Sequence, residues 1–551
     1  MSKLPEKTVR IGIIGPGAIS RKFAAGLKAA PGTELAGVVS RDPGRAAVFA
    51  TDFGVPRVFD SYNAMLADES IDLVYIGLVN TMHYKVARSA ILHGKGVILE
   101  KPFTLNAYEA ERLIRLARDR HVFLMEAMWT RFHPVNRQVL EWCSSGRIGR
   151  ISRVEASFGY FGGDNPESRQ LNPALGGSAL LDVGIYPLAY ASMLLGEPEE
   201  LRAAALQNDT GVDRQIEIAA VYKNATASLA ASVTNQLGSE AMIFGDKGFI
   251  RVPVFFNPVK AILYRYGTDQ ESNPAIVETF VHAEPANGYE YEAIAAAEAF
   301  RQGLSEHPWL TLGESLSLMK QMDLCRSQLE LVYPGERAIL FDCDGVLVDS
   351  EDLLAKIAAA LLNEDGIPAK PEDFRAFIGT GEERYIGGVC ELYGKTYDPA
   401  LKPRLYAKYF QDAPELLAEV PGAKALIRDL LASGVKVAVA SSADSGKVLA
   451  NLKALGIAPA EFAAVTTGSD VKNMKPDPEI YLKTAEAVGV PPEHCIVIED
   501  AEAGIQAGKA GGMKTIGITT ALPAARLREA GADQVVDSLD ELYALLDIGK
   551  A

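Results

Sequence analysis

Three things are scarce in this sequence: paired cysteines, positive charge and long hydrophobic runs. The five cysteines are odd in number and none forms a C-x-x-C pair, which argues against a disulfide framework or structural zinc site and favours a reducing, cytoplasmic compartment. Lys and Arg number 55 against 71 Asp and Glu, for a net charge of −16, so nucleic acid is not an expected partner. No apolar run reaches about 18 residues and the N-terminus lacks an apolar signal region, so we expect no membrane partner.

Strands and helices alternate over residues 1–126 of a chain whose 551 residues suffice for about three to four domains. Helical stretches such as Ala18–Ala30 and Ala107–His121 separate short apolar runs. These runs predict buried strands at Val9–Ile14, Glu34–Ser40, Leu73–Gly77, Gly96–Glu100 and Val122–Glu126. The alternation predicts an α/β domain with a doubly wound parallel sheet.

Residues 127–333 show a different pattern, in which strand-like segments follow one another. Polar and apolar residues alternate along Thr226–Val233, as in a strand with one buried face, and residues 245–248 (Gly-Asp-Lys-Gly) are typical of a hairpin turn. Further strands are predicted at Ile151–Phe161, Gln215–Tyr222, Glu240–Phe244 and Gly248–Arg251, and a closing helix at Leu312–Leu331. The pattern predicts an α+β domain with a largely antiparallel sheet.

Residues 334–336 (Pro-Gly-Glu) are the predicted linker to a second α/β alternation. This alternation covers residues 337–350 and 421–551, and a nearly all-helical insert, residues 351–420, interrupts it. Its predicted strands are Arg337–Phe341, Lys436–Ala440, Ala464–Thr467, Cys495–Ile498 and Thr515–Ile518. Because extended chain spans at most about 3.5 Å per residue, such a linker keeps the two halves close.

A glycine-rich turn follows the first predicted strand. Gly15 and Gly17 allow a tight turn, and Ala18 and Ile19 open a helix whose N-terminus can hold a pyrophosphate. Ser20 stands at the third glycine position, so the dinucleotide-binding fingerprint is incomplete. The alternative interpretation is an ordinary glycine turn.

The second strand ends at Ser40 and Arg41, where an NAD site usually carries an acidic residue for the ribose hydroxyls. A hydroxyl and a guanidinium suit a 2′-phosphate instead, because Arg pairs bidentately with phosphate oxygens. The sequence therefore favours NADP(H) over NAD(H). Arg41 could also be a solvated loop residue.

Glu100, Lys101 and a proline follow another strand end, where open α/β sheets bind their ligands. Lys101 is therefore predicted to point toward the nicotinamide region. Asn80 and His83 follow the preceding strand and are predicted to flank the same crevice, although His83 could equally be a packed loop histidine.

Asp182 and Tyr186 are four residues apart on a predicted helix and so share one face. A tyrosine beside Lys101 can act as general acid/base, since the ammonium favours the phenolate and lowers the tyrosine pKa. Without Lys101, two polar residues on an exposed helix would be the default interpretation.

The first half resembles the glucose–fructose oxidoreductase/inositol dehydrogenase (Gfo/Idh/MocA) family, in particular its NADP-dependent dihydrodiol and D-xylose dehydrogenases. The resemblance depends on residues 100–102, 124–132 and 177–186. It implies a Rossmann NADP-binding domain over residues 1–126, a substrate and dimerisation domain over 127–333, and hydride transfer to or from a sugar-like molecule. It also implies general acid/base Tyr186, catalytic Lys101 and a homodimer formed through the exposed face of the antiparallel sheet. Candidates for the substrate wall are Trp129, Arg131, Phe132 and Arg169.

Four polar clusters follow four strands of the second half. Asp342 and Asp344 suit covalent phosphoryl transfer, one as nucleophile and the other as proton donor. The other clusters are Ser441-Ser442, which offers phosphoryl donors, Lys475, and Glu499-Asp500. Oxygen ligands around a dianionic substrate imply Mg²⁺.

This half resembles the haloacid dehalogenase superfamily, in the branch that contains β-phosphoglucomutase and phosphoglycolate phosphatase. The resemblance implies that Asp342 is the nucleophile and Asp344 the general acid/base, and that residues 351–420 form a mobile cap. It further implies that Ser441 and Lys475 bind phosphoryl oxygens. Mg²⁺ would be bound by Asp342, the Asp344 carbonyl and Asp500, assisted by Glu499.

Two departures from the mutase pattern favour a phosphatase of sugar or polyol monophosphates. Leu354 stands where β-phosphoglucomutase has a histidine, and Glu382 aligns with its phosphate-binding cap arginine. Arg384 could still reach a substrate from the cap.

The sequence as a whole predicts a bifunctional, cytoplasmic enzyme. Its oxidoreductase and phosphatase sites would act one after the other on one small-molecule sugar or polyol phosphate. Two alternatives remain open at this stage. One half could be an idle regulatory or scaffold module, or the two activities could be unrelated.

Overall fold

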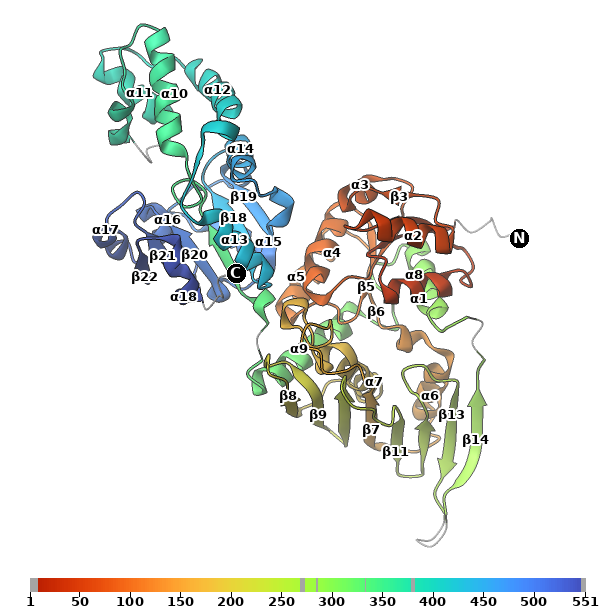
Figure 1. Ribbon diagram of the computed structural model, residues 1–551. Coiled ribbons are helices and arrows are strands. Elements are labelled where there is room, and N and C mark those ends of the chain that lie inside the picture. Colours follow the sequence, from red (N-terminus) through yellow and green to blue (C-terminus); the bar gives the residue numbers. More distant parts are fainter. Residues whose placement is uncertain (1–7, 268–272, 284–285, 332, 378–381, 547–551) are drawn as a thin grey trace. The chain divides into compact units, whose positions relative to one another are not determined.

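The computed structural model describes residues 8–267, 273–283, 286–331, 333–377 and 382–546. The chain divides into two compact units, residues 1–333 and 334–551. The first unit contains two sheets, and the second contains one large sheet, a two-stranded sheet and a group of helices (Figure 1).

The first sheet is wholly parallel, with strand order β3-β2-β1-β4-β5-β6. The order reverses between β1 and β4, and open sheets of this kind bind dinucleotides outside the carboxyl ends of the strands at that point. Its strands are β1 Val9–Ile14, β2 Thr33–Val39, β3 Val58–Phe59, β4 Leu73–Ile76, β5 Gly96–Glu100 and β6 Leu124–Ala127. The predicted doubly wound sheet is confirmed, with the two-residue β3 in addition.

Helices cover both faces of this sheet. α1 packs against α2 and α8, whereas α4 packs against α5, which also contacts α9 (Figure 1). The helices are α1 Ala18–Leu27, α2 Pro43–Phe53, α3 Tyr62–Ala67, α4 His83–Leu92, α5 Ala107–Asp119, α8 Glu290–Arg301 and α9 Leu312–Gln328. Because both faces are covered, the strands are apolar throughout rather than alternating.

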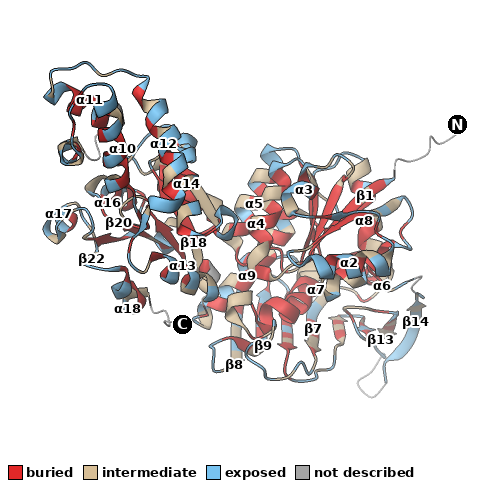
Figure 2. Ribbon diagram, turned by 45° about the horizontal axis from the view of Figure 1, so that its top comes forward, coloured by how far each residue is buried: buried red, intermediate tan, exposed pale blue. Residues whose placement is uncertain are grey.

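The second sheet is mixed, with strand order β14-β13-β12-β11-β7-β10-β9-β8. Only β7 and β10 pair in parallel among its described strands, which fits the largely antiparallel prediction. The strands are β7 Ile151–Gly159, β8 Glu200–Gln207, β9 Asp213–Tyr222, β10 Ala225–Ser232, β11 Ala241–Gly245, β12 Gly248–Val252, β13 Lys260–Arg265 and β14 Ala275–Val281. Helices α6 (Pro134–Ser144), α7 (Ile185–Leu195) and α9 contact the sheet, and Figure 2 shows β14 largely exposed.

Pro173–Leu195 has the length and hydropathy of a membrane-spanning helix, where none was expected. It contains a π-helical turn, Leu180–Gly184, followed by α7. However, 78% of its most apolar window is buried inside the protein, against β7 and β10. Packing in the core therefore accounts for its apolar character.

The large sheet of the second unit is also wholly parallel, with strand order β19-β18-β15-β20-β21-β22. Its strands are β15 Ala338–Phe341, β18 Lys436–Ser441, β19 Ala464–Thr467, β20 Cys495–Glu499, β21 Lys514–Ile518 and β22 Gln534–Val536. Around it lie α13 Ala423–Ala432, α14 Ser445–Leu455, α15 Glu479–Val488, α16 Glu502–Ala510, α17 Ala524–Glu529 and α18 Leu542–Leu546. Pro334–Glu336 forms a single 3₁₀ turn.

The helical insert has a hydrophobic core of its own, which includes Leu354, Phe374 and Tyr409. It consists of α10 Ser350–Glu364, a 3₁₀ segment Pro371–Phe377, α11 Glu382–Leu392 and α12 Leu401–Leu416. A two-stranded sheet of β16 (Val348–Asp349) and β17 (Ala418–Glu419) joins its two ends to the parallel sheet. The insert is thus a separately packed subdomain anchored at both ends.

Candidate active sites

The turn between β1 and α1 leaves the main chain accessible. Gly15 has φ +86°, and a Cβ there would lie 2.8 Å from the Gly77 carbonyl oxygen, so the turn requires glycine. A Cβ on Gly17, the N-cap of α1, would have no neighbour closer than 3.9 Å. The helix N-terminus, which continues with Ala18 and Ile19, is therefore open to a phosphate.

Ser20, at the third glycine position, stabilises this turn. Its side chain is fully buried, and Oγ donates a hydrogen bond to the Gly15 carbonyl at 2.6 Å. The incomplete fingerprint thus keeps its shape through a hydroxyl where other sequences have glycine.

Positive charges gather beyond the end of β2. Arg41 is exposed, and Ser40 Oγ accepts a hydrogen bond from the Asp42 amide at 3.1 Å. The pKa of Lys85 in α4 is lowered, first by burial and then by the positive charge of Arg41. Two cations near one strand end favour an anion there, and Lys85 carried no motif signal in the sequence.

Lys101 and Asp182 form the centre of the first site. Lys101 Nζ donates to the Asp182 carbonyl at 2.6 Å and to Oδ1 at 3.1 Å. Arg169 Nη2 lies 3.1 Å from both Asp182 oxygens, and Tyr160 donates to Oδ2 at 2.9 Å. Burial opposes ionisation of Asp182, but Lys101 and Arg169 outweigh it and hold its pKa well below the ordinary value.

Tyr186 lies beside this pair. Lys101 Nζ is 5.1 Å from the Tyr186 ring centroid, and Trp129 Nε1 donates to the Tyr186 hydroxyl at 3.2 Å. Burial raises the Tyr186 pKa, and Lys101 only partly offsets this. The expectation of a lowered tyrosine pKa is therefore wrong: burial dominates, and the phenol is protonated at neutral pH.

Asn80 and His83 are bound to the main chain. Asn80 Nδ2 donates to the Gly176 carbonyl at 2.8 Å. The two ring nitrogens of His83 contact the carbonyls of Pro102 at 2.9 Å and Leu78 at 3.2 Å, and burial lowers the His83 pKa to about 4. His83 is fully buried, so it fixes the Lys101–Pro102 turn and has no free nitrogen for the predicted cofactor contact.

Glu100 supports the same turn. One carboxylate oxygen accepts from the buried Tyr75 hydroxyl, and the other accepts from the Lys101 amide at 3.1 Å. Burial raises the Glu100 pKa, and Lys101 opposes this. Glu100 therefore orients Lys101 and adds negative charge behind it.

The four predicted wall residues separate into two groups. Trp129 contacts Tyr186, and Arg169 contacts Asp182, as described above. Arg131 instead pairs with Glu314 and donates to the Trp309 carbonyl at 2.6 Å, and Phe132 packs against His307 and Trp309.

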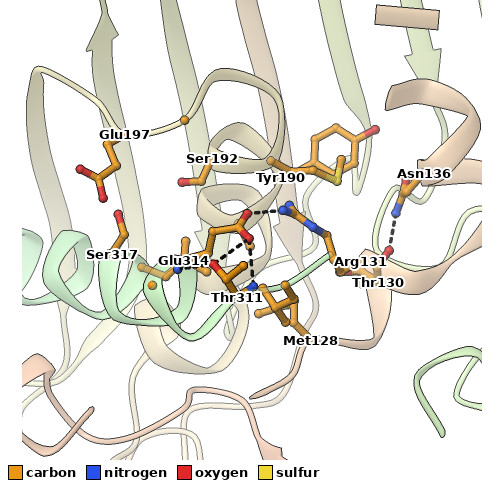
Figure 3. A pocket seen from close by; sticks show the side chains of 16 residues that line it. Met128, Thr130, Arg131, Asn136, Tyr190, Ser192, Glu197, Thr311, Glu314 and Ser317 are labelled. Atoms are coloured by element: carbon orange, nitrogen blue, oxygen red, sulfur yellow. Dashed lines mark hydrogen bonds and ion pairs between the residues drawn. The ribbon is translucent and has the colours of Figure 1, made fainter. Parts of the chain in front are cut away.

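Arg131 lines a separate pocket of about 340 Å³ (Figure 3). It contains none of Lys101, Asp182 and Tyr186. Polar side chains in its lining include Thr130, Arg131, Asn136, Ser192, Glu197, Thr311, Glu314 and Ser317. The pocket therefore adjoins the Trp129 segment but is not the lysine–tyrosine site.

Aromatic rings surround Tyr186 in a way the sequence did not indicate. Phe158 lies 5.4 Å from the Tyr186 ring, edge-on, and stacks on Phe256 at 3.9 Å. Tyr289 stacks on Trp129 at 4.4 Å. Single aromatics in strands or loops look like core residues in a sequence, so no local signal could have identified them.

In the second unit, Lys475 joins two buried carboxylates. Its Nζ lies 2.6 Å from Asp342 Oδ1 and 2.7 Å from Glu499 Oε1. Glu499 also accepts from Tyr481 at 3.0 Å and from the amides of Asp500 and Ala501, both at 3.0 Å. Both oxygens of Glu499 thus accept hydrogen bonds from the protein, and Oε1 helps to hold Lys475.

Asp500 lies against the loop that carries Asp344. A Cβ on Gly345, which has φ +76°, would lie only 1.8 Å from Asp500 Oδ2. Burial raises the pKa of Asp500, and the nearby charges of Glu499 and Asp342 raise it further. The pKa of Asp342 is also raised, chiefly by burial and despite Lys475.

Asp342, Asp500 and the adjacent Asp344 carbonyl are oxygen donors with excess negative charge, which suits a hard divalent cation. Among the described residues, no group of three or more His, Cys, Asp or Glu side chains is arranged to hold a metal. The predicted set also included Glu499, which does not join a three-carboxylate group with the other two side chains. Asp342, Asp500 and the Asp344 carbonyl remain as oxygen donors, and their chemistry fits the ion.

The predicted phosphate contacts lie at neighbouring strand ends. Ser441 is buried at the end of β18, with Oγ 3.5 Å from Asp344 Oδ2, and it accepts from the Ala443 amide at 3.2 Å. Ser442 is exposed. Asp344 Oδ1 is held by Ser350, Asn451 and Lys447, and none of these three contacts was predicted from the sequence.

The positions that distinguish a phosphatase from a mutase lie in the insert. Leu354 packs in its hydrophobic core. Glu382 begins α11, but its side chain lies outside the described residues. Arg384 is exposed and pairs with Glu391 at 2.7 Å.

The fold and these clusters define an oxidoreductase joined to a hydrolase, and comparisons with known families agree. An oxidoreductase family with an NAD-binding Rossmann fold matches residues 9–128, and the GFO/IDH/MocA C-terminal domain matches 136–251. Haloacid dehalogenase-like hydrolases match residues 339–518. The first unit belongs to the GFO/IDH/MocA family and the second to the haloacid dehalogenase-like hydrolases.

Individual relatives match the oxidoreductase part. Trans-1,2-dihydrobenzene-1,2-diol dehydrogenase from Xenopus tropicalis is 31% identical over 59% of this chain and 98% of its own length. The human enzyme of that name is 31% identical over 60% and 99%. A 3-ketoreductase from Actinomadura kijaniata, solved with NADP and TDP-benzene, is 29% identical over 58% of this chain and 98% of its own, with a TM-score of 0.52. An aldose-aldose oxidoreductase from Caulobacter crescentus (21%, TM-score 0.53, 59% and 98% covered) supports the fold.

Proposed function

We propose that the chain is a bifunctional enzyme, an NADP-dependent oxidoreductase of a sugar or polyol fused to a Mg²⁺-dependent sugar or polyol phosphatase. The observation that carries this proposal is that each unit places a buried lysine and a reactive side chain together at the carboxyl edge of its sheet. These pairs are Lys101 with Tyr186, and Lys475 with Asp342. An idle second module would have no need of such a cluster.

For the oxidoreductase, we assign proton transfer to Tyr186. When bound, the nicotinamide cofactor supplies or accepts the hydride. Tyr186, protonated at neutral pH, donates its proton to the carbonyl oxygen of the substrate during reduction. Lys101 stabilises the phenolate that results, and Asp182 holds Lys101 in place through two contacts.

Cofactor choice is assigned to the positive charge beyond β2. Arg41 and Ser40 would contact the 2′-phosphate of NADP, and Lys85 would add a second cation. The similar 3-ketoreductase was solved with NADP, which supports the same choice. Gly15, Gly17 and the N-terminus of α1 would hold the pyrophosphate.

For the hydrolase, we assign covalent phosphoryl transfer. Asp342 attacks phosphorus, Asp344 protonates the departing oxygen, and Ser441 and Lys475 hold phosphoryl oxygens. Mg²⁺, bound by Asp342, Asp500 and the Asp344 carbonyl, would neutralise the negative charge that gathers there. The absence of a histidine at Leu354 favours hydrolysis over mutase chemistry.

We further propose that the enzyme works in the cytoplasm as a homodimer through the open face of the mixed sheet. All five cysteines are free thiols, as suits a reducing compartment. Phe249 stacks on Tyr264 at 4.4 Å and lies near Phe244 on the partly exposed side of the sheet. Light scattering on the purified chain would measure the oligomeric state.

The deciding experiment tests sequential action on one metabolite. Sugar phosphates supplied with NADPH and Mg²⁺ should yield a phosphate-free polyol from the wild-type chain. With Asp342→Asn, a reduced but still phosphorylated intermediate should accumulate. If the oxidoreductase accepts neither the substrates nor the products of the phosphatase, the coupled reaction is wrong, and the idle-module or unrelated-activities alternative replaces it.

A further inference from the structure

We infer that Lys447 is a positioning residue of the phosphatase, which orients Asp344 so that one oxygen faces the leaving group. The inference rests on the proposed phosphatase function. Lys447 belongs to none of the four polar clusters at the strand ends, and it lies in the first turn of α14.

Three donors converge on a single oxygen of Asp344. Lys447 Nζ and Asn451 Nδ2, one helical turn apart on α14, each lie 3.0 Å from Oδ1. Ser350, at the start of α10, donates to the same oxygen. Lys447 is 9% exposed and Asn451 is fully buried, so bulk water does not compete for these contacts.

The other oxygen, Oδ2, points toward the phosphoryl site. Its hydrogen-bond partner among the described residues is Ser441 Oγ, at a long 3.5 Å. Ser441 ends β18, beside the Asp342–Lys475 pair. A carboxyl group held through Oδ1 can carry a transferable proton only on Oδ2, since three donors already occupy the first oxygen.

This orientation serves both halves of the reaction. In the first, a bond forms between an Asp342 oxygen and phosphorus, the P–O ester bond breaks, and the leaving oxygen takes the proton from Asp344 Oδ2. In the second, Oδ2 accepts a proton from water as the water oxygen attacks phosphorus, and the P–O bond to Asp342 breaks. Inorganic phosphate then leaves and both aspartates return to their starting forms.

Lys447 differs from the two neutral donors in carrying charge. Its described ion-pair partner is Asp344, whereas Lys475 serves Asp342 and Glu499. Asn451 is itself held by Tyr409 of α12, at 2.6 Å from the tyrosine hydroxyl to Oδ1. These hydrogen bonds therefore connect the insert and α14 to Asp344, the acid/base residue.

The test compares two esters in the full chain with Mg²⁺. p-Nitrophenyl phosphate releases a phenolate that needs no proton, whereas glycerol phosphate releases an alkoxide that does. Lys447→Met should lower kcat/KM for glycerol phosphate about tenfold or more beyond any loss with p-nitrophenyl phosphate, as part of the roughly 10²–10⁴ that general acids supply. The ratio of kcat/KM for glycerol phosphate to kcat/KM for p-nitrophenyl phosphate should return close to the wild-type value in Lys447→Arg. Lys453 is an exposed lysine on the same helix, and Lys453→Met should leave this ratio unchanged.

Because both esters are measured on one sample, partial misfolding cancels from the ratio. If the Met variant fails to fold, Lys447→Gln should shift the ratio in the same direction. An equal loss with both esters, or none, would overturn the positioning role. Failure of the wild-type chain on both esters would overturn the phosphatase assignment, and the role of Lys447 with it.

Discussion

Both sites use a lysine followed by proline in the segment that comes after a parallel strand, but the charges around the two lysines differ. In the first unit two cations, Lys101 and Arg169, face two carboxylates, Asp182 and Glu100. In the second unit two cations face four carboxylates; the charged groups there are Lys447, Lys475, Asp342, Asp344, Glu499 and Asp500. Among these groups acidic side chains outnumber cations only in the second site; two further carboxyls beside the first, Glu126 and Glu292, have pKa values raised by burial.

The carboxylate pKa values follow this difference. The pKa of Asp182 is lowered because its two cations outweigh burial. The pKa values of Asp342 and Asp500 are raised, first by burial and then by neighbouring carboxylates. The raised carboxyl pKa values in the second site mean that a bound cation would be favoured there, which is the basis of the Mg²⁺ predictions below.

The largest effect should come from Asp342→Asn. An amide cannot form the aspartyl-phosphate, so hydrolysis of phosphate monoesters should fall to background. NADPH oxidation by the same protein should be unchanged, and it serves as an internal control for folding. Phosphate release is the measurement, and hydrolysis at the wild-type rate by a sequence-verified variant would refute covalent catalysis.

Tyr186→Phe should produce the corresponding loss in the first unit. Turnover should fall roughly 10²–10⁴-fold, because the proton donor is removed while the cofactor contacts remain. Tyr190→Phe is the matched control: this buried hydroxyl, one turn further along α7, has no hydrogen-bond partner among the described side chains. Near-normal turnover of Tyr186→Phe at saturating substrate would assign the proton to another residue.

Mg²⁺ should stabilise the second unit and not the first. At about a hundred times its Kd, the ion should add about 2.7 kcal/mol to the free energy of unfolding. Denaturant unfolding of the full chain with and without Mg²⁺, followed by probes in each unit, would measure this. Asp500→Asn should remove most of the shift.

The carboxyl groups of the two sites should change the stability of the protein with pH in opposite directions. Asp342 and Asp500 have raised pKa values in the folded state, so without metal their contribution falls as pH rises above the unfolded value of 3.8. Asp182 has a lowered pKa, so its stabilisation is present above 3.8 and is lost as pH falls below it. The Mg²⁺ shift should therefore be larger at about pH 8 than at about pH 5.

The strand-end motifs were predictable because both parallel sheets align carboxyl ends at one edge. This placed Asp342, Ser441 and Lys475 together, and Lys101 near the nucleotide turn. Elements with weak patterns were missed: no residue of β14 is fully buried, so it lacks the alternation that marks a half-buried strand. The position of β3 was missed because it has only two residues.

Side-chain contacts between distant elements were the least predictable part of both sites. Lys447 lies 103 positions from Asp344 in the chain, and nothing around it resembles a motif. His83 looked like a cofactor residue because it follows a strand, but burial and two carbonyl contacts give it a structural role. Only the folded structure shows which polar groups are already hydrogen-bonded to other groups of the protein and are therefore not available to a ligand.

The smallest effect should come from Arg41→Ala. Lys85 keeps a second positive charge near the 2′-phosphate, so loss of one charged contact, worth roughly 1.5–3 kcal/mol, should reduce the preference for NADPH over NADH about tenfold or more without abolishing binding. Arg120→Ala, an exposed arginine at the end of α5, controls for the general loss of surface charge. Fluorescence titration with both cofactors would measure the change. Equal affinity of the wild-type chain for NADPH and NADH would refute the assignment of Ser40 and Arg41. The first site would then not distinguish cofactors by the 2′-phosphate.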